Sequence, residues 1–193
     1  MASGSSRPNA ISRKIAIMGY PCVGKSSITL RFVQGHFPES YNTTIEDMHT
    51  KNFRYKNKDY KLFITEYAVF PHSCAVGIDG YVLVYAIDDE YSFQMLSTIH
   101  DKILDSVGDT KVPLVLIGNK LDLASRRRVS SDVARKQAAA WGAEFLEISA
   151  KDNDSKVSDI FNLTLNRIEE FRESRNPKTP KSSLDQKSNC LLM

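Results

Sequence analysis

The sequence predicts an α/β fold, with a six-stranded, mostly parallel sheet that carries helices on both faces. Short apolar runs rich in Val, Ile and Leu alternate with longer amphipathic stretches between residues 13 and 172. Near-continuous apolar runs are typical of strands buried on both faces, and strand–helix alternation is typical of a parallel sheet. The length of 193 residues is enough for one domain with a full core and too short for two.

The expected elements follow in chain order. Alternation over 48–55 and the turn KNKD (56–59) predict a hairpin into the next strand. The other strands are expected at 14–18, 60–65, 81–87, 113–119 and 144–149. Helices are expected at 25–34, 92–107, 131–141 and 156–173, the last with apolar residues at three- and four-residue spacing.

Composition sets the domain boundaries and excludes several classes of protein. Residues 1–12 are small and polar and are expected to be a disordered N-terminus, 13–172 the globular domain, and 173–193 a flexible tail rich in Pro, Ser and Lys. A net charge of +3 is too small to predict nucleic-acid binding. Three scattered cysteines predict no disulfide framework and a reducing, cytoplasmic compartment. No signal peptide or spanning segment is expected.

Residues 19–27, GYPCVGKSS, lie between the first expected strand and the first expected helix and fit G-x-x-x-x-G-K-[ST]. In such a loop, backbone N–H groups converge on phosphate oxygens, and the helix N-terminus adds partial positive charge. The lysine would neutralise the β- and γ-phosphates, and the following hydroxyl would ligate Mg²⁺. The cysteine is interpreted as inert, with a redox-sensitive thiol as the alternative. The predicted phosphate site comprises Gly19, Cys22, Val23, Gly24, Lys25, Ser26 and Ser27.

Two further motifs, GNKLD (118–122) and ISAKD (148–152), each end an expected strand. A carboxylate at Asp122 can accept hydrogen bonds from the ring N–H and the exocyclic amine of guanine. Adenine lacks this donor pair, a mismatch worth about 1–3 kcal/mol. Asn119 would tie its loop to the phosphate loop, and the Ala150 N–H would meet the guanine oxygen. The predicted base site comprises Asn119, Lys120, Asp122, Ser149, Ala150 and Lys151.

The chain resembles the Ras-superfamily small GTPases in GYPCVGKSS, TTIED (43–47), GNKLD, ISAKD and the terminal CLLM. The stretches RKIAIMGYPCVGKSS, GHFPESYNTTIED and VFPHSCAVGIDGYVLVYAI are most similar to the Rheb branch. This resemblance implies a P-loop GTPase fold, GTP, GDP and Mg²⁺ as cofactors, and slow GTP hydrolysis. It also implies a switch that activates the TOR kinase complex and is served by a GTPase-activating protein.

The same resemblance implies roles for residues after the first helix. Phe37 would stack on guanine, Pro38 and Tyr41 would border ribose and phosphates, and Thr44 would join Ser26 as a protein ligand of Mg²⁺. The switch YNTTIEDMH departs from the branch, which usually carries Asp-Pro before the threonine. The implied effector-binding residues are Tyr41, Thr44, Ile45, Glu46 and Asp47.

One family segment is missing. The resemblance implies Asp-x-x-Gly-Gln after the strand at 60–65, where the Asp holds a Mg²⁺-bound water, the Gly N–H binds the γ-phosphate and the Gln orients the attacking water. Here Ile64-Thr65 joins Glu66 directly, as though six residues had been cut out. No catalytic residue is therefore identified, the second switch is expected to be shortened, and hydrolysis is expected to be impaired. The gap is either an evolved feature or a splice variant, gene-model error or engineered deletion.

The terminal CLLM fits a farnesylation motif, with Cys190 as the lipidated residue. Residues 172–193 carry five Lys/Arg and two Asp/Glu, a charge of +3. One lipid chain with a basic patch predicts a monomer peripherally attached to endomembranes after modification by a farnesyltransferase.

Three functions stay open. The first is a nucleotide-gated switch of Rheb type, and the second is a hydrolysis-deficient adaptor that binds GTP or GDP without a working cycle. The third, a small-molecule phosphotransferase, is disfavoured because Asn119–Asp122 selects guanine and no arginine-rich lid is evident. The only basic cluster in the sequence, SRRR (125–128), is most simply a solvated loop.

Overall fold

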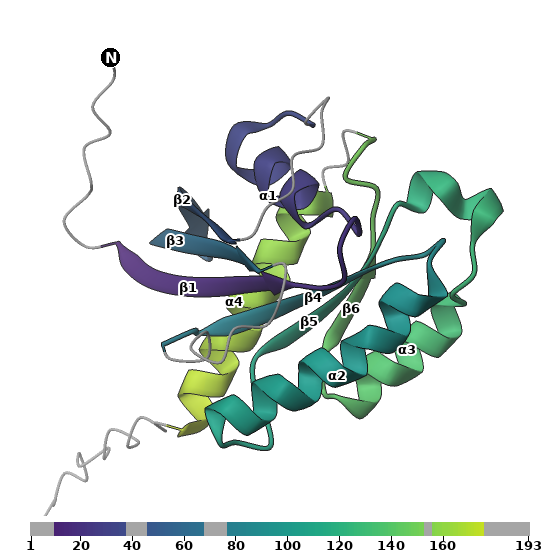
Figure 1. The fold of residues 1–193 in the computed structure, drawn as a ribbon. Helices are drawn as coiled ribbons and strands as arrows, with labels where there is room; N and C mark the ends of the chain where they lie inside the picture. The colour runs from purple at the N-terminus through teal and green to yellow at the C-terminus, as the bar shows by residue number, and fades with distance from the viewer. Residues whose placement is uncertain (1–9, 38–45, 68–76, 153–155, 176–193) are drawn as a thin grey trace, which may run out of the picture.

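The described residues form a six-stranded sheet in the order β2-β3-β1-β4-β5-β6. The computed structural model describes residues 10–37, 46–67, 77–152 and 156–175 (Figure 1). β2 is antiparallel to β3, and the other neighbouring strands are parallel, so the predicted α/β fold is confirmed. The strands are β1 (Ile11–Met18), β2 (Glu46–Tyr55), β3 (Lys58–Tyr67), β4 (Gly80–Ala86), β5 (Leu114–Asn119) and β6 (Glu144–Glu147).

Helices cover both faces of this sheet (Figure 1). On one face Phe32 of α1 stacks on Phe161 of α4 with ring centroids 3.6 Å apart, inside one buried cluster. On the other face Leu96 of α2 and Ala138 of α3 lie in a second cluster. No helix among the described residues is long and apolar enough to cross a membrane. The helices are α1 (Lys25–Gln34), α2 (Glu90–Val107), the 3₁₀ helix η1 (Leu121–Arg126), α3 (Ser131–Ala140) and α4 (Lys156–Arg175).

The predicted hairpin joins β2 to β3. Lys56 and Asn57 have φ of 45° and 61°, the left-handed pair that a two-residue turn requires. β3 runs beyond the expected 60–65: Glu66 and Tyr67 continue it, paired with both β1 and β2. The joint after Thr65 therefore lies inside a regular strand.

The parallel strands bring their carboxyl ends to one edge of the sheet. β1 lies between β3 and β4, so the chain order reverses beside it, and ligands bind in such crevices of α/β sheets. The loop after β1 and those after β5 and β6 all leave from this edge (Figure 1).

Candidate nucleotide-binding site

The phosphate loop connects β1 to α1 and needs glycine at both ends. Gly19 has φ of +154°, and a Cβ there would lie 2.1 Å from the Val84 carbonyl oxygen. Gly24 has φ of +96°, and its Cβ would lie 2.3 Å from Nδ2 of Asn119. A side chain at either position would push the loop away from the sheet edge.

The start of α1 is open to an anion. Gly24 at its N-cap offers no side-chain cap, and no acidic residue lies in the first turn. By contrast, Asp89 and Ser130 cap α2 and α3 with side-chain acceptors. The N–H groups and partial positive charge at the start of α1 therefore suit a phosphate.

Lys25 lies beneath this loop with its side chain buried. Its Nζ donates to the carbonyl oxygens of Gly19 and Tyr20 at 3.0 and 3.1 Å. Burial lowers the pKa of Lys25, and the nearby charge of Glu66 works against that shift. An ammonium group has three N–H donors, so one remains for a phosphate oxygen.

Asn119 joins the three loops. Its Nδ2 donates to the Val23 carbonyl oxygen at 2.8 Å, and its Oδ1 accepts from the Ala150 N–H at 3.1 Å. Asn119 is buried, so these hydrogen bonds are shielded from water. The predicted tie between this loop and the phosphate loop is thus present. The Ala150 N–H, which was predicted to meet the guanine oxygen, has its one hydrogen directed at Asn119, so the guanine contact stays a prediction that would have to share or exchange this bond.

Ser149 positions Asp122. Its Oγ donates to Oδ1 of Asp122 at 2.7 Å and accepts from the N–H of Asp152 at 3.1 Å. Ser149 is buried and Asp122 is exposed, so the carboxylate is held from behind and faces outward. Lys120 precedes it in a left-handed conformation, with its Nζ 3.8 Å from Oδ1 of Asp88.

Arg31 was not predicted as part of the site. From α1 its Nε donates to the Ala150 carbonyl oxygen at 3.1 Å and its Nη2 to that of Lys151 at 2.6 Å. Its guanidinium also lies 6.0 Å from the ring centroid of Phe37. Because the first contact spans 119 residues of sequence, no local pattern could have indicated it.

Glu66 is the other residue that the predicted site lacked. Its Oε2 accepts a hydrogen bond from Oγ of Ser26 at 2.6 Å, and the side chain is 1% exposed. A usable signal was present, because Tyr60, Leu62, Ile64 and Glu66 alternate on one buried face of β3.

The residues around Ser26 fit Mg²⁺. Mg²⁺ prefers oxygen ligands and takes most of them from phosphate and water, with one or two protein groups. The hydroxyl of Ser26 and the buried carboxylate of Glu66 supply such oxygens. Among the described residues, no three His, Cys, Asp or Glu side chains converge on a metal-sized site, so phosphate and water would complete the shell.

Several predicted residues lie outside the described ranges: Pro38, Tyr41, Thr44, Ile45 and Cys190. Of the rest, Glu46 and Asp47 begin β2, and the Asp47 carboxylate lies 3.1 Å from Nε2 of His49. Cys22 is exposed in a left-handed conformation, and Val23 is buried beside it.

The interpretation of 125–128 as a solvated loop is wrong for Arg127. Its two Nη atoms contact the two carboxylate oxygens of Glu147 at 2.6 and 2.9 Å. This bidentate hydrogen bonding raises the pKa of Arg127. The residue after η1 is therefore anchored to the end of β6.

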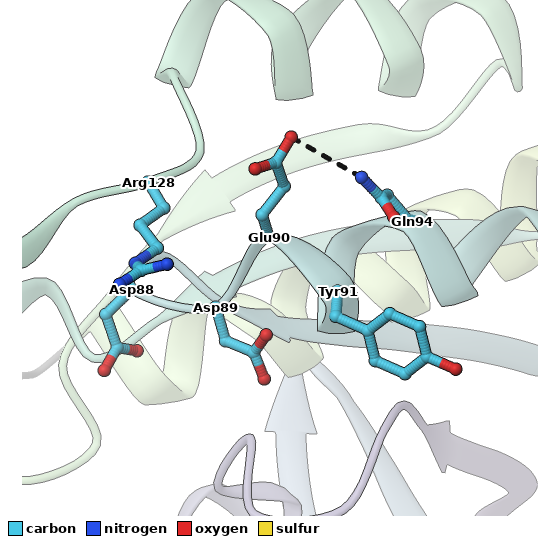
Figure 2. Close-up of a pocket in the computed structure, with 6 residues that line it drawn as sticks. All are labelled: Asp88, Asp89, Glu90, Tyr91, Gln94 and Arg128. Carbon is cyan, nitrogen blue, oxygen red and sulfur yellow. Dashed lines mark hydrogen bonds between the residues drawn. The ribbon is translucent and has the colours of Figure 1, made fainter.

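A separate pocket follows β4 at the start of α2 (Figure 2). Figure 2 shows three carboxylates and one guanidinium on its wall, and none of the predicted nucleotide-binding residues lines it. Its acidic lining would repel phosphates, so this pocket does not compete with the phosphate loop as the nucleotide site. It is lined by Asp88, Asp89, Glu90, Tyr91, Gln94 and Arg128.

A mostly parallel sheet with a glycine-bounded phosphate loop, an uncapped helix start and two further loops at the same edge defines a P-loop nucleotide-binding domain. The model of the Ras family matches residues 14–170. This chain belongs to the Ras family, whose members bind GTP and GDP with Mg²⁺ and hydrolyse GTP.

The chain is similar along most of its length to curated Rheb proteins. It is 44% identical to "GTP-binding protein Rheb homolog 1" of Caenorhabditis elegans, covering 91% of this chain and 87% of that protein. It is 46% identical to "GTP-binding protein Rheb homolog" of Drosophila melanogaster, covering 93% and 97%. It is 43% identical to "GTP-binding protein Rheb" of Homo sapiens, covering 80% and 86%. By homology it is a Rheb-like GTP-binding protein.

Proposed function

We propose that this chain is a Rheb-type molecular switch that binds GDP and GTP through the three loops at the sheet edge. The observation that carries the proposal is the Asn119 bridge, because one buried side chain links the phosphate loop to both base loops. The phosphate loop would hold the phosphates, Ser26 and Thr44 the metal, and Phe37 and Asp122 the base.

The finer parts of this function rest on the resemblance to the Rheb branch. The chain acts as a monomer in TOR-linked growth signalling, with a GTPase-activating protein and the TOR kinase complex as partners. Farnesylation of Cys190 by a farnesyltransferase attaches it peripherally to endomembranes, helped by the basic tail.

GTP hydrolysis is impaired in this proposal, because the family glycine and glutamine have no counterpart at the Thr65–Glu66 joint. The same joint favours a second candidate, an adaptor that holds GTP or GDP without a working cycle. β3 supports this alternative, since it continues as a regular strand through the position where the family pattern would leave the sheet.

Guanine selectivity tests the proposal. In displacement of a fluorescent GDP from the full chain with Mg²⁺, GDP should compete about 5- to 150-fold better than ADP, because only guanine offers a donor pair to the Asp122 carboxylate. Asp122→Asn should weaken GDP by about 5- to 150-fold, the equivalent of about 1–3 kcal/mol.

Asp105→Asn is the matched control, because Asp105 is an exposed carboxylate on α2 away from the three loops. It should leave GDP affinity unchanged. Equal competition by GDP and ADP would refute the proposed function.

A further inference from the structure

Glu66 is a buried carboxylate with one oxygen that makes no hydrogen bond to the described residues. One oxygen, Oε2, accepts from the Ser26 hydroxyl, and the other, Oε1, has no hydrogen-bond partner among them. Nε2 of His49 lies 3.8 Å from Oε1. No described Lys or Arg lies within ion-pair distance of the carboxylate, although its charge acts on the buried Lys25 ammonium. Burying a carboxylate oxygen without a hydrogen bond is costly, so Oε1 calls for a cation or a strongly polarised water.

The hydrogen bond to Ser26 does not block metal binding. A serine hydroxyl has one hydrogen and two lone pairs. Because its hydrogen goes to Glu66, the hydroxyl can direct a lone pair at Mg²⁺ without breaking that bond. The carboxylate that accepts the hydrogen bond also makes the hydroxyl oxygen a stronger metal ligand, because groups hydrogen-bonded to metal ligands generally raise the basicity of those ligands.

The unpaired Oε1 completes the argument. Bound Mg²⁺ keeps several waters, which are strong hydrogen-bond donors. A carboxylate accepts through both oxygens, so Oε1 can take a proton of a metal-bound water while Oε2 holds Ser26. Cross-strand pairing with Ile17 and Asp47 fixes the backbone of Glu66 in the sheet and aims it toward the start of α1.

We infer that Glu66 is a positioning residue for the Mg²⁺ of this chain, holding the Ser26 hydroxyl and a metal-bound water. This inference rests on the proposed function. Binding of Mg²⁺ and sensing of the γ-phosphate are then separate properties of this chain. Glu66 supports the bound Mg²⁺, whereas the joint has no glycine or glutamine that could sense the γ-phosphate. Mg²⁺ should therefore retain GDP as well as it retains GTP.

The experiment measures GDP dissociation from the full chain against Mg²⁺ concentration and in EDTA. Glu66→Gln keeps the size but removes the charge, and it should weaken apparent Mg²⁺ affinity about 10- to 100-fold. In EDTA its GDP dissociation rate should change less than about twofold, because Glu66 acts through the metal. Glu66→Asp keeps the charge and should stay closer to the wild type.

Glu169→Gln is the matched control. It also removes a carboxylate acceptor, the one that Arg13 contacts at 2.7 and 2.9 Å, but it lies on α4 away from the loops. Its Mg²⁺ dependence should equal that of the wild type. A change in this control as large as that of Glu66→Gln would overturn the inference.

Failure of the inference and failure of the proposed function look different. If the wild type binds GDP with Mg²⁺ but Glu66→Gln keeps wild-type Mg²⁺ affinity, the inference alone falls. If the wild type shows no guanine-nucleotide binding, both the inference and the proposed function fail.

If the variants do not fold, a crystal structure of the wild type with Mn²⁺ and GDP tests the inference instead. The anomalous peak should lie within about 5 Å of a Glu66 oxygen, a metal–water distance plus a hydrogen bond. A longer distance would overturn the inference.

Discussion

Gly24 ends the phosphate loop in a left-handed conformation, and the space beside its Cα is already taken by the Asn119 amide. That amide makes the bond to the Val23 carbonyl oxygen that links two of the three loops. At the scale of single residues, the site therefore depends on the lack of a side chain at Gly24 as much as on polar side chains such as that of Asn119. The same holds for Gly19 against the Val84 carbonyl oxygen.

Gly24→Ala should cost more than backbone strain alone. The left-handed conformation costs a non-glycine residue about 1–2 kcal/mol, and displacing Asn119 should add about 1–3 kcal/mol by leaving polar groups unpaired. Gly108→Ala, with φ of +66° and open space around its Cβ, isolates the strain. Urea unfolding should rank Gly24→Ala as the more destabilised, and only this variant should lose GDP affinity. Equal losses in both variants would contradict the prediction.

Elements are held in place by contacts from outside their own segments. The strand β6 has four residues and partly buried side chains, so its pairing with β5 is brief. Arg127, the residue after η1, donates two hydrogen bonds to Glu147 at the end of β6. Burial and the Glu147 charge raise the pKa of Tyr85, whose buried ring lies in the same region. The contact between Arg127 and Glu147 therefore holds the loops after β5 and β6 at a fixed distance from each other.

Arg127→Ala should destabilise the fold by about 1–3 kcal/mol, because it leaves the Glu147 carboxylate, 14% exposed, without its bidentate partner. Arg172→Ala is the matched control: its side chain is 54% exposed and makes one 3.4 Å contact with Asp79. That exposed pair should contribute no more than about 0.5 kcal/mol. Chemical unfolding measures both, and similar losses would argue against the anchoring role.

The whole molecule brings distant segments to one sheet edge. The site combines the phosphate loop, the end of β3 and the loops after β5 and β6, which come from both halves of the chain. The parallel topology makes these segments neighbours. A switch responds to the γ-phosphate only through contacts that differ between GTP and GDP. The Thr65–Glu66 joint lacks the glycine that would supply such a contact, so the domain should bind nucleotide while discriminating poorly between its two forms.

Inserting Asp-Thr-Ala-Gly-Gln-Asp between Thr65 and Glu66 should restore that response. The wild type should hydrolyse GTP more slowly in a single-turnover assay than the insertion variant. The variant should also gain about 10- to 100-fold in preference for GTP over GDP, the equivalent of about 1.5–3 kcal/mol for one N–H contact to a charged phosphate. Equal rates in the two proteins would contradict impaired hydrolysis.

Much of the fold was predictable because strand and helix periodicities are local. Helix α1 matches its predicted range of 25–34, and every described strand lies at or near a predicted run. The phosphate loop and Asn119 were predictable because their motifs are short and contiguous. Glu66 was missed although period-two alternation along β3 placed it on the buried face. Arg31 and Arg127 could not be found, because their partners are distant or depend on how loops meet.

The sequence by itself determined the class of fold and the phosphate loop, and it predicted a preference for guanine over adenine, since each depends on residue types at short, fixed spacing. Only the tertiary structure decided which carboxylate faces Ser26 and which side chains tie the loops together. The physical reason is that strand pairing sets where a side chain points in space, and pairing joins residues that the chain keeps far apart.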